Sequence, residues 1–346
     1  MTDKTKSLLV RLGSFLLAAG LLYFALRNVD LKQVGRDLSQ ANYWWAFPVV
    51  FVTLFSHWLR AWRWTFLLDQ LPTGPPDKRG REPKRVDILG AFGAVMIGYL
   101  ANYVAPRVGE VVRTASVSTR FHRPFTAVLG TVITERILDV VTMALALLTI
   151  PLVFSGRIWE IRDLLVAPLQ DKLPYVSPWI ILATTLAVVA AGFALFRWIQ
   201  TGHGARIARI LAALRDGLAT VALTPRRVEL VVSTLLIWLC YGTMAYLPFL
   251  MFGFDVTYGI GYFDAWGIML LGAIGVVIPS PGGFGSFHYI TIQSLVLLFA
   301  FSSDAAASYA ILTHTGQLLI YVITGAVFVL GMGLRFSGSA GEPALE

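Results

Sequence analysis

Several charged side chains in this sequence lie inside apolar runs, and they are the residues best suited to chemistry. Glu135, Arg136 and Asp139 interrupt a run that extends from Pro124 to about Phe154. Glu135 and Asp139 are four residues apart and therefore share one face of a helix, beside an arginine that carboxylates can bind. Two interpretations stay open: an ion pair that fixes helix packing, or a site that positions the arginine or carries protons.

A second apolar run, residues 43–68, contains His57, Arg60 and Arg63 at spacings of three. This spacing places the three side chains on one side of a helix. An arginine inside a membrane costs about 3 kcal/mol or more, so it normally faces the interior of a helix bundle or a wet cavity. The alternative is that the long side chain of Arg60 or Arg63 reaches the membrane surface.

A third polar group follows the apolar residues 88–104. This stretch barely reaches the length that crosses a bilayer, about 17 residues. Pro106 comes next and is followed by Arg107, Glu110 and Arg113. We therefore predict a helical hairpin that re-enters on the side it came from, rather than a crossing.

A fourth break lies at residues 278–288, Ile-Pro-Ser-Pro-Gly-Gly-Phe-Gly-Ser-Phe-His, inside an apolar run from about residue 266 to 301. The prolines remove backbone donors, and the glycines permit backbone angles that other residues avoid. Because freed N–H and C=O groups are costly in hydrocarbon, such a break persists only inside protein or beside a wet cavity. The helix that restarts near Phe284 then directs free N–H groups at an anion such as phosphate. The alternative is a simple loop between two spanning helices.

The composition sets the class of protein. The chain is 56% hydrophobic and 14% charged, with a mean hydropathy of +0.69, whereas a soluble domain carries about 25% charged residues. The net charge of +8 comes from basic loops between apolar runs, as the positive-inside rule expects, so no nucleic-acid partner is predicted. The single cysteine, Cys240, excludes an intramolecular disulfide and a cysteine metal cluster. We predict an all-α integral membrane protein.

The loops predict the topology. Basic loops lie at residues 69–87, 105–123 and 197–227. Spanning helices are expected at about residues 12–26, 43–68, 124–154, 178–196, 228–252 and 305–334. The basic loops share one side if both broken segments are hairpins, which gives about six spanning helices plus two oppositely entering re-entrant or broken helical hairpins, a possible inverted repeat. Residues 1–335 then form one polytopic domain with cytoplasmic termini, residues 27–42 an interfacial helix, and residues 336–346 a disordered tail.

Three motifs, in this order and spacing, resemble one family. They are Gly98-Tyr-Leu-Ala-Asn-Tyr-Val-Ala-Pro-Arg-Val-Gly-Glu-Val-Val-Arg113, Thr134-Glu-Arg-Ile-Leu-Asp139 and Pro279-Ser-Pro-Gly-Gly-Phe-Gly285. The chain is similar over nearly its whole length to the flippase-like family of the lysylphosphatidylglycerol synthase transmembrane region. The resemblance implies a translocase of the cell membrane that moves a phospholipid between leaflets. Only a short tail follows Arg335, so we expect no aminoacyl-transferase half.

The motifs of cofactor chemistry are absent from the sequence. It contains no G-x-x-x-x-G-K-[ST] loop for a nucleotide, and its five histidines lack metal-ligand spacing. We expect no cofactor, no metal, no catalytic residues and no enzyme activity. The predicted ligand is an anionic phospholipid or a polyprenyl phosphate-linked species, and a separate lipid-modifying enzyme is a candidate partner. The alternatives are an integral-membrane transferase acting on a lipid phosphate, or a non-catalytic partner of a lipid-modifying enzyme.

The predicted headgroup site combines the embedded arginines, their neighbouring carboxylates and the broken-helix N-terminus. Arginine suits phosphate because its planar guanidinium makes two parallel hydrogen bonds that lysine cannot copy. The residues assigned to this site are Arg60, Asn102, Arg107, Glu110, Arg113, Glu135, Arg136, Asp139, Pro281, Gly282, Gly283, Gly285 and His288.

Overall fold

Every regular element that the computed structural model describes is helical. The described residues are 16–71, 85–104, 108–157, 225–277 and 281–331. The spanning helix predicted at residues 178–196, most of the basic loop 197–227 and the predicted tail lie outside them. The all-helical class predicted from composition is confirmed for the described part of the chain.

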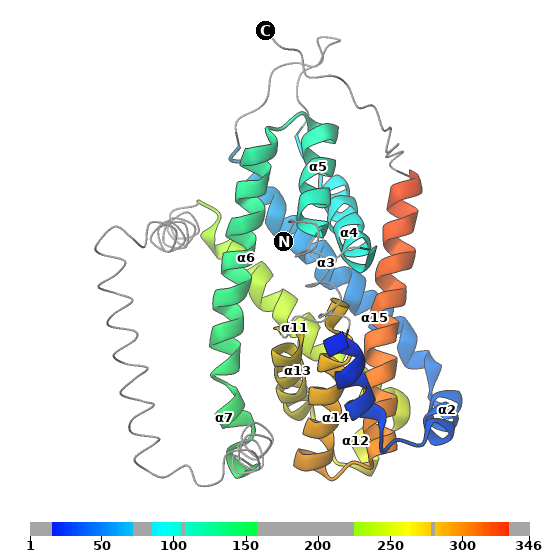
Figure 1. Cartoon of the computed structure of the whole chain (residues 1–346). Helices are drawn as coiled ribbons and strands as arrows, with labels where there is room; N and C mark the ends of the chain where they lie inside the picture. The colour runs from blue at the N-terminus through cyan, green and yellow to red at the C-terminus, as the bar shows by residue number, and fades with distance from the viewer. Residues whose placement is uncertain (1–15, 72–84, 105–107, 158–224, 278–280, 332–346) are drawn as a thin grey trace, which may run out of the picture.

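Four long helices frame the bundle (Figure 1). They are α3 (Ala46–Leu68), α6 (Phe125–Leu147), α11 (Arg227–Phe252) and α15 (Ser303–Gly331). Among the described residues, three segments are long and apolar enough to cross a membrane: Phe125–Val153, Arg227–Phe252 and Ser303–Gly331. Helix α3 has the same length as α6, 23 residues, but its polar side chains interrupt the apolar sequence.

The first broken helix pair consists of α4 (Ile88–Val104) and α5 (Gly109–Phe121), which pack against each other. Two glycines allow a close crossing. A Cβ at Gly109 would overlap the carbonyl oxygen of Gly98, and one at Gly98 would lie 3.0 Å from the carbonyl oxygen of Gly109. Oδ1 of Asn102 accepts the Gly109 N–H at 2.7 Å and satisfies a donor at the start of α5.

The second broken pair consists of α13 (Tyr262–Val277) and α14 (Ser286–Phe299), joined through the short helix η3 (Pro281–Gly283). The backbone φ angles of Gly282, Gly283 and Gly285 are 60°, 76° and 80°, a region that glycine adopts without a Cβ penalty. A glycine also permits the close crossing here, because a Cβ at Gly275 would lie 2.8 Å from the carbonyl oxygen of Ser286. The glycine-dependent break predicted from the sequence is confirmed.

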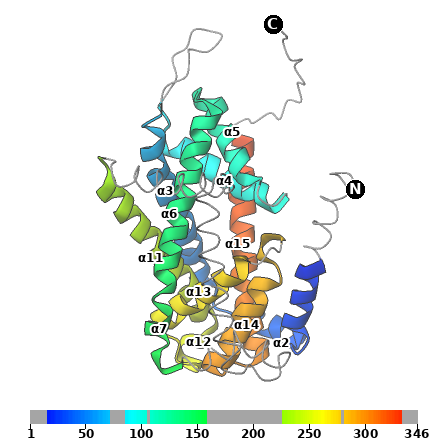
Figure 2. The same cartoon turned by 60° about the vertical axis from the view of Figure 1, so that its left-hand side comes forward.

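The two pairs occupy opposite halves of the bundle. In both views α4 and α5 lie in the upper half and α13 and α14 in the lower half (Figures 1 and 2). The broken end of the second pair reaches the first, because η3 packs against α4 and a Cβ at Gly282 would lie 3.7 Å from Tyr103 Cε1. The second break therefore lies against the end of α4, between the two halves of the bundle.

Short helices complete the lower end of the bundle in Figure 1. They are α2 (Leu31–Gln40), η1 (Tyr43–Trp45), α7 (Ile150–Val153), η2 (Ser155–Arg157) and α12 (Phe254–Thr257). The helical residues Leu16–Leu26 precede them. The structure confirms a short helix, α2, within the predicted residues 27–42. The side chain of Asp30 caps the start of α2 by accepting the Lys32 N–H at 2.9 Å.

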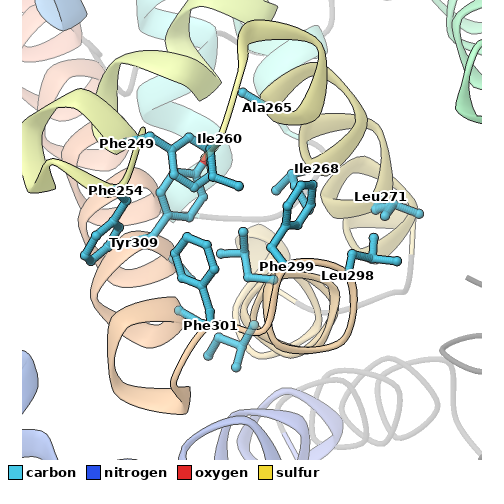
Figure 3. Close-up of a cluster of buried hydrophobic side chains, with 14 of the residues drawn as sticks. Phe249, Phe254, Ile260, Ala265, Ile268, Leu271, Leu298, Phe299, Phe301 and Tyr309 are labelled. Atoms are coloured by element: carbon cyan, nitrogen blue, oxygen red, sulfur yellow. The ribbon is translucent and has the colours of Figure 1, made fainter. Parts of the chain in front are cut away.

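Each broken pair has an apolar cluster of its own. The cluster beside the second pair includes Phe249, Phe301 and Tyr309 (Figure 3), and the Phe249 and Tyr309 rings stack with centroids 4.0 Å apart. The Tyr309 hydroxyl donates to the Ala245 carbonyl at 2.7 Å, which joins α15 to α11. The cluster beside the first pair contains Trp64 and other side chains of α3, α4, α5 and α6. Both clusters fix helices whose polar side chains meet between them.

Candidate functional site

Glu135 is the centre of a buried charge cluster. Its Oε1 accepts from Arg60 Nη1 at 2.9 Å and from Arg63 Nη2 at 3.4 Å, and its Oε2 lies 3.0 Å from Arg113 Nη2. Glu135 and Arg63 are each only 1% exposed. Three arginines from α3 and α5 therefore hold one carboxylate of α6, as burial of an ion demands.

Asp139 extends this cluster by one helical turn. Its Oδ2 accepts from Arg60 Nη1 at 2.9 Å, and its Oδ1 accepts from Arg63 Nη2 at 2.6 Å. The spacing of three between the arginines on α3 matches the spacing of four between the carboxylates on α6, so each arginine meets both acids. The spacing of these residues thus produces an ion-pair network of two arginines and two carboxylates.

Arg136 is held more loosely than the other arginines. Its guanidinium lies 3.7 Å from Glu110 Oε1 on α5 and 3.7 Å from Asp139 Oδ2, and its side chain is 42% exposed. The cluster then contains four arginines, Arg60, Arg63, Arg113 and Arg136, against the carboxylates Glu110, Glu135 and Asp139. Among the described residues one positive charge remains in excess, and Arg136 is the arginine with the greatest exposure and with no carboxylate nearer than 3.7 Å.

Neutral side chains hold the inner arginines in place. The Tyr241 hydroxyl accepts from Arg60 Nη2 at 2.8 Å, and Thr234 Oγ1 accepts from Arg63 Nη1 at 3.1 Å. The guanidinium of Arg113 lies over the ring of Trp64, 4.9 Å from its centroid, at a distance where a cation–π contact is favourable. These contacts fix Arg60, Arg63 and Arg113 as part of the scaffold.

A cavity of about 340 Å³ opens beside the cluster. Its charged end is formed by Arg60, Arg136 and Asp139. Its apolar wall comes from α6, α11 and the second broken pair: Met143, Trp238, Met244, Ile268, Met269 and Phe287. Such a cavity accepts a small molecule with an anionic end and an apolar end.

His57 closes one side of the cavity. Its ring centroid lies 4.6 Å from that of Tyr99 and 5.1 Å from that of Tyr321, and the residue is 1% exposed. Neither ring nitrogen has a hydrogen-bond partner in the part of the chain that the structure describes. The histidine is therefore a cavity-lining residue with two buried ring nitrogens that are unpaired within the described residues.

The sequence model of the lysylphosphatidylglycerol synthase transmembrane region matches residues 11–325. The chain belongs to this family. Comparisons with curated proteins and with solved structures found no match. The resemblance predicted from the three motifs is confirmed. This membership makes the chain a membrane protein linked to lipid metabolism or transport.

The structure brings together most of the charged residues that the sequence predicted for the headgroup site. Those that meet in the cluster are Arg60, Glu110, Arg113, Glu135, Arg136 and Asp139. Arg60 and Arg63 do not extend toward a surface, because both are buried against carboxylates. The partners of Glu135 come from α3 and α5, whereas its neighbour Arg136 pairs with Asp139 on its own helix and with Glu110 on α5. Arg107 lies outside the described residues.

The remaining assigned residues make contacts of a different kind. Asn102 caps α5 inside the first broken pair. The residues of the second break are Pro281, Gly282, Gly283, Gly285 and His288. Here the Gly282 carbonyl lies 3.0 Å from His314 Nε2, and the His288 ring packs 4.9 Å from the ring of His314. These contacts fix the break, and its neighbour Phe287 is the residue that reaches the cavity.

Sequence reasoning did not assign several residues of the site. Arg63 lies three residues after Arg60 and shares its helical face, and this spacing could have assigned Arg63 to the site. Tyr241 and Trp238 are ordinary aromatic residues of an apolar helix, so nothing in their sequence context distinguished them from core residues. Thr291 and Gln317 also line the cavity. No sequence pattern identifies them, because a single polar residue has no characteristic spacing.

Proposed function

We propose that this protein moves an anionic, phosphate-bearing lipid or lipid-linked intermediate between the leaflets of the cell membrane. The observation that carries the proposal is the cavity whose charged end contains Arg60 and the loosely held Arg136. Family membership supports a link to lipids. The proposed activity makes and breaks no covalent bond, and it uses no cofactor.

The cluster explains how the cavity binds a phosphate. The inner arginines are buried and paired with Glu135 and Asp139, so they supply a rigid wall of fixed geometry. Arg136 is the most exposed arginine of the cluster, and its planar guanidinium suits two phosphate oxygens. Because Glu110 and Asp139 each lie 3.7 Å from Arg136, a phosphate can replace these long contacts with shorter ones.

The proposed membrane placement puts the cavity near the bilayer midplane. The two broken helix pairs are then re-entrant hairpins of opposite entry, and about six helices span the bilayer, as in transporters with inverted repeats. The end of α5, the start of α6 and the end of α15 lie at the top of Figure 1, and Arg120 belongs to the last turn of α5. Arg85 and Arg226 both pair with Asp69, which follows α3. By the positive-inside rule we place this end in the cytoplasm, and we propose that both termini are cytoplasmic as well.

Movement through such a site lowers the barrier for the headgroup. A charged phosphate pays a large desolvation cost in about 30 Å of hydrocarbon. The arginine-lined cavity replaces the lost water, while the apolar wall contacts the lipid and the acyl chains stay in the bilayer. Net movement is driven by a gradient of the lipid or of an ion, since the chain has no nucleotide-binding motif.

The test uses purified protein in liposomes that contain a trace of fluorescent phosphatidylglycerol. Dithionite added outside bleaches only the outer leaflet, so loss of signal beyond one half reports movement between leaflets. We expect such a loss without ATP, and no loss in protein-free liposomes. If no anionic lipid and no polyprenyl phosphate moves, transport is rejected in favour of a transferase acting on a lipid phosphate or a non-catalytic partner role.

A further inference from the structure

Thr291 differs from the other buried hydroxyls of its helix. Buried serine and threonine side chains in helices usually donate to a carbonyl three or four residues earlier. Ser294, one turn further along α14, follows this rule and donates to the Ile290 carbonyl at 2.7 Å. The Thr291 hydroxyl has no partner among the described residues, although Thr291 is 1% exposed and lines the cavity.

His57 presents the same situation on α3. It is buried, it lines the cavity, and its ring nitrogens have no partner in the described residues. Thr313 Oγ1 on α15 is a further case in the same cavity. Buried polar atoms in folded proteins are nearly always hydrogen-bonded, so orphaned groups on several residues that line one cavity need an explanation. A ligand that carries hydrogen-bonding groups of its own supplies it.

The orphaned groups are chemically different from the charged end. An imidazole and a hydroxyl suit neutral hydroxyl groups, because each can donate or accept one hydrogen bond without a counter-ion. The amide of Gln317 and the hydroxyl of Tyr241 line the same cavity. The cavity therefore offers an anion-binding end at Arg136 and a separate set of neutral polar groups.

We infer that the ligand is a phosphodiester whose headgroup is polyhydroxylated, such as an inositol or a sugar, with hydroxyls bound by His57 and Thr291. The inference rests on the proposed function only in that both use this cavity. A volume of about 340 Å³ is at the lower end of cavities that hold small organic ligands, which fits a single ring with its phosphate. A bare phosphate would leave the neutral groups unpaired.

The test is calorimetric titration of the purified full-length protein with short-chain lipids. Dihexanoyl phosphatidylinositol and dihexanoyl phosphatidylmethanol carry the same single charge and differ in their hydroxyls. We expect the inositol lipid to bind about tenfold more tightly, since a site built for hydroxyls discriminates against a ligand that lacks them. Equal affinities for the two lipids overturn the inference.

Two variants assign the hydroxyl contacts to residues. Thr291→Val and His57→Phe keep the side-chain shape and should each reduce the preference for the inositol lipid about fivefold, with unchanged affinity for phosphatidylmethanol. Thr291→Val should also raise the melting temperature of the ligand-free protein, because it removes a buried unpaired hydroxyl. The control Ser294→Ala should keep the full preference. If both variants keep it as well, these residues do not bind hydroxyls.

A soluble headgroup distinguishes the source of the ligand. Glycerophosphoinositol that binds at least tenfold more weakly than the dihexanoyl lipid assigns the site to a membrane lipid, whereas equal affinity assigns it to a soluble ester; the hydroxyl contacts stand in either case. Binding is measured here without transport. A protein that prefers the inositol lipid but moves no lipid therefore supports this inference and rejects the proposed function, and transport without such a preference does the reverse.

Discussion

In both broken helix pairs glycine allows the two helices to cross closely, but the pairs are attached to the bundle differently. Gly98 and Gly109 bring α4 and α5 together, and Gly275 brings α13 and α14 together. The first pair then contributes charge, because Arg113 on α5 is paired with Glu135. The second pair contributes apolar side chains and one hydroxyl to the cavity, and its break is held by His314.

This difference separates two tasks: the first pair holds the charge cluster beside the cavity, and the second pair forms part of the cavity wall. A charge is held in place by other charges, so the first pair is joined to α3 and α6 through ions that are costly to separate. A wall that contacts different parts of a lipid needs no charge, and the second pair provides it by packing. The comparison predicts that electrostatic changes act mainly through the first pair and steric changes through both.

Glu135→Gln should give the largest loss of stability. The substitution removes the negative charge that three buried arginines share, and the loss of one partner of a buried ion pair costs about 3–5 kcal/mol. Thermal unfolding in detergent measures the effect. The control is Glu110→Gln, which removes a half-buried carboxylate with a single long contact and should cost less than about 1 kcal/mol. Similar losses for both variants would show that the buried cluster does not hold the first pair.

Gly109→Ala and Gly275→Ala should each destabilise the protein by about 1–3 kcal/mol, because the new methyl group overlaps a backbone oxygen of the opposing helix. Gly130→Ala and Gly316→Ala serve as controls, since a Cβ at either position meets no other atom within 4 Å. They should be neutral or stabilising by up to about 1 kcal/mol. The same thermal measurement applies. A neutral Gly275→Ala together with a damaging Gly109→Ala would mean that only the first crossing is tight.

His314→Phe should have the smallest effect, about 1 kcal/mol, and it should be confined to the second pair. Phenylalanine keeps the stacking with Phe287 but loses the contact with the Gly282 carbonyl. Hydrogen exchange of the first amides of α14 is the sensitive measurement, and it should speed up while exchange in α5 is unchanged. Equal acceleration in both pairs would indicate that the breaks are coupled rather than separately held.

Much of the fold was predictable because local chemistry determines it. The apolar runs predicted the helices, and the glycines near residue 282 predicted a break that only positive φ angles allow. The pairing of α3 with α6 was not predictable. Spacing places Arg60 and Arg63 on one face and Glu135 and Asp139 on another, but no local rule states that these faces meet.

The candidate site was also predictable only in part. Ions in apolar helices stood out because their burial is costly, so the charged residues were found although their partners were not. The neutral residues of the cavity were missed, since Thr291 in a helix looks like any other threonine until its missing hydrogen bond is seen. The assigned histidine, His288, attracted notice through the break beside it, yet it packs against aromatic rings and His314.

The central claim is that Arg136 binds the phosphate of a lipid that crosses the bilayer. The most direct measurement is the rate of fluorescent phosphatidylglycerol movement in liposomes for the wild-type protein, Arg136→Lys and Arg136→Gln, each with its melting temperature. Because Arg136 is half-exposed and loosely paired, we predict melting temperatures close to that of the wild type. We predict transport at least tenfold slower for Arg136→Gln and clearly reduced for Arg136→Lys, whose charge is kept but whose two parallel hydrogen bonds are lost. Wild-type rates in both variants would contradict the account.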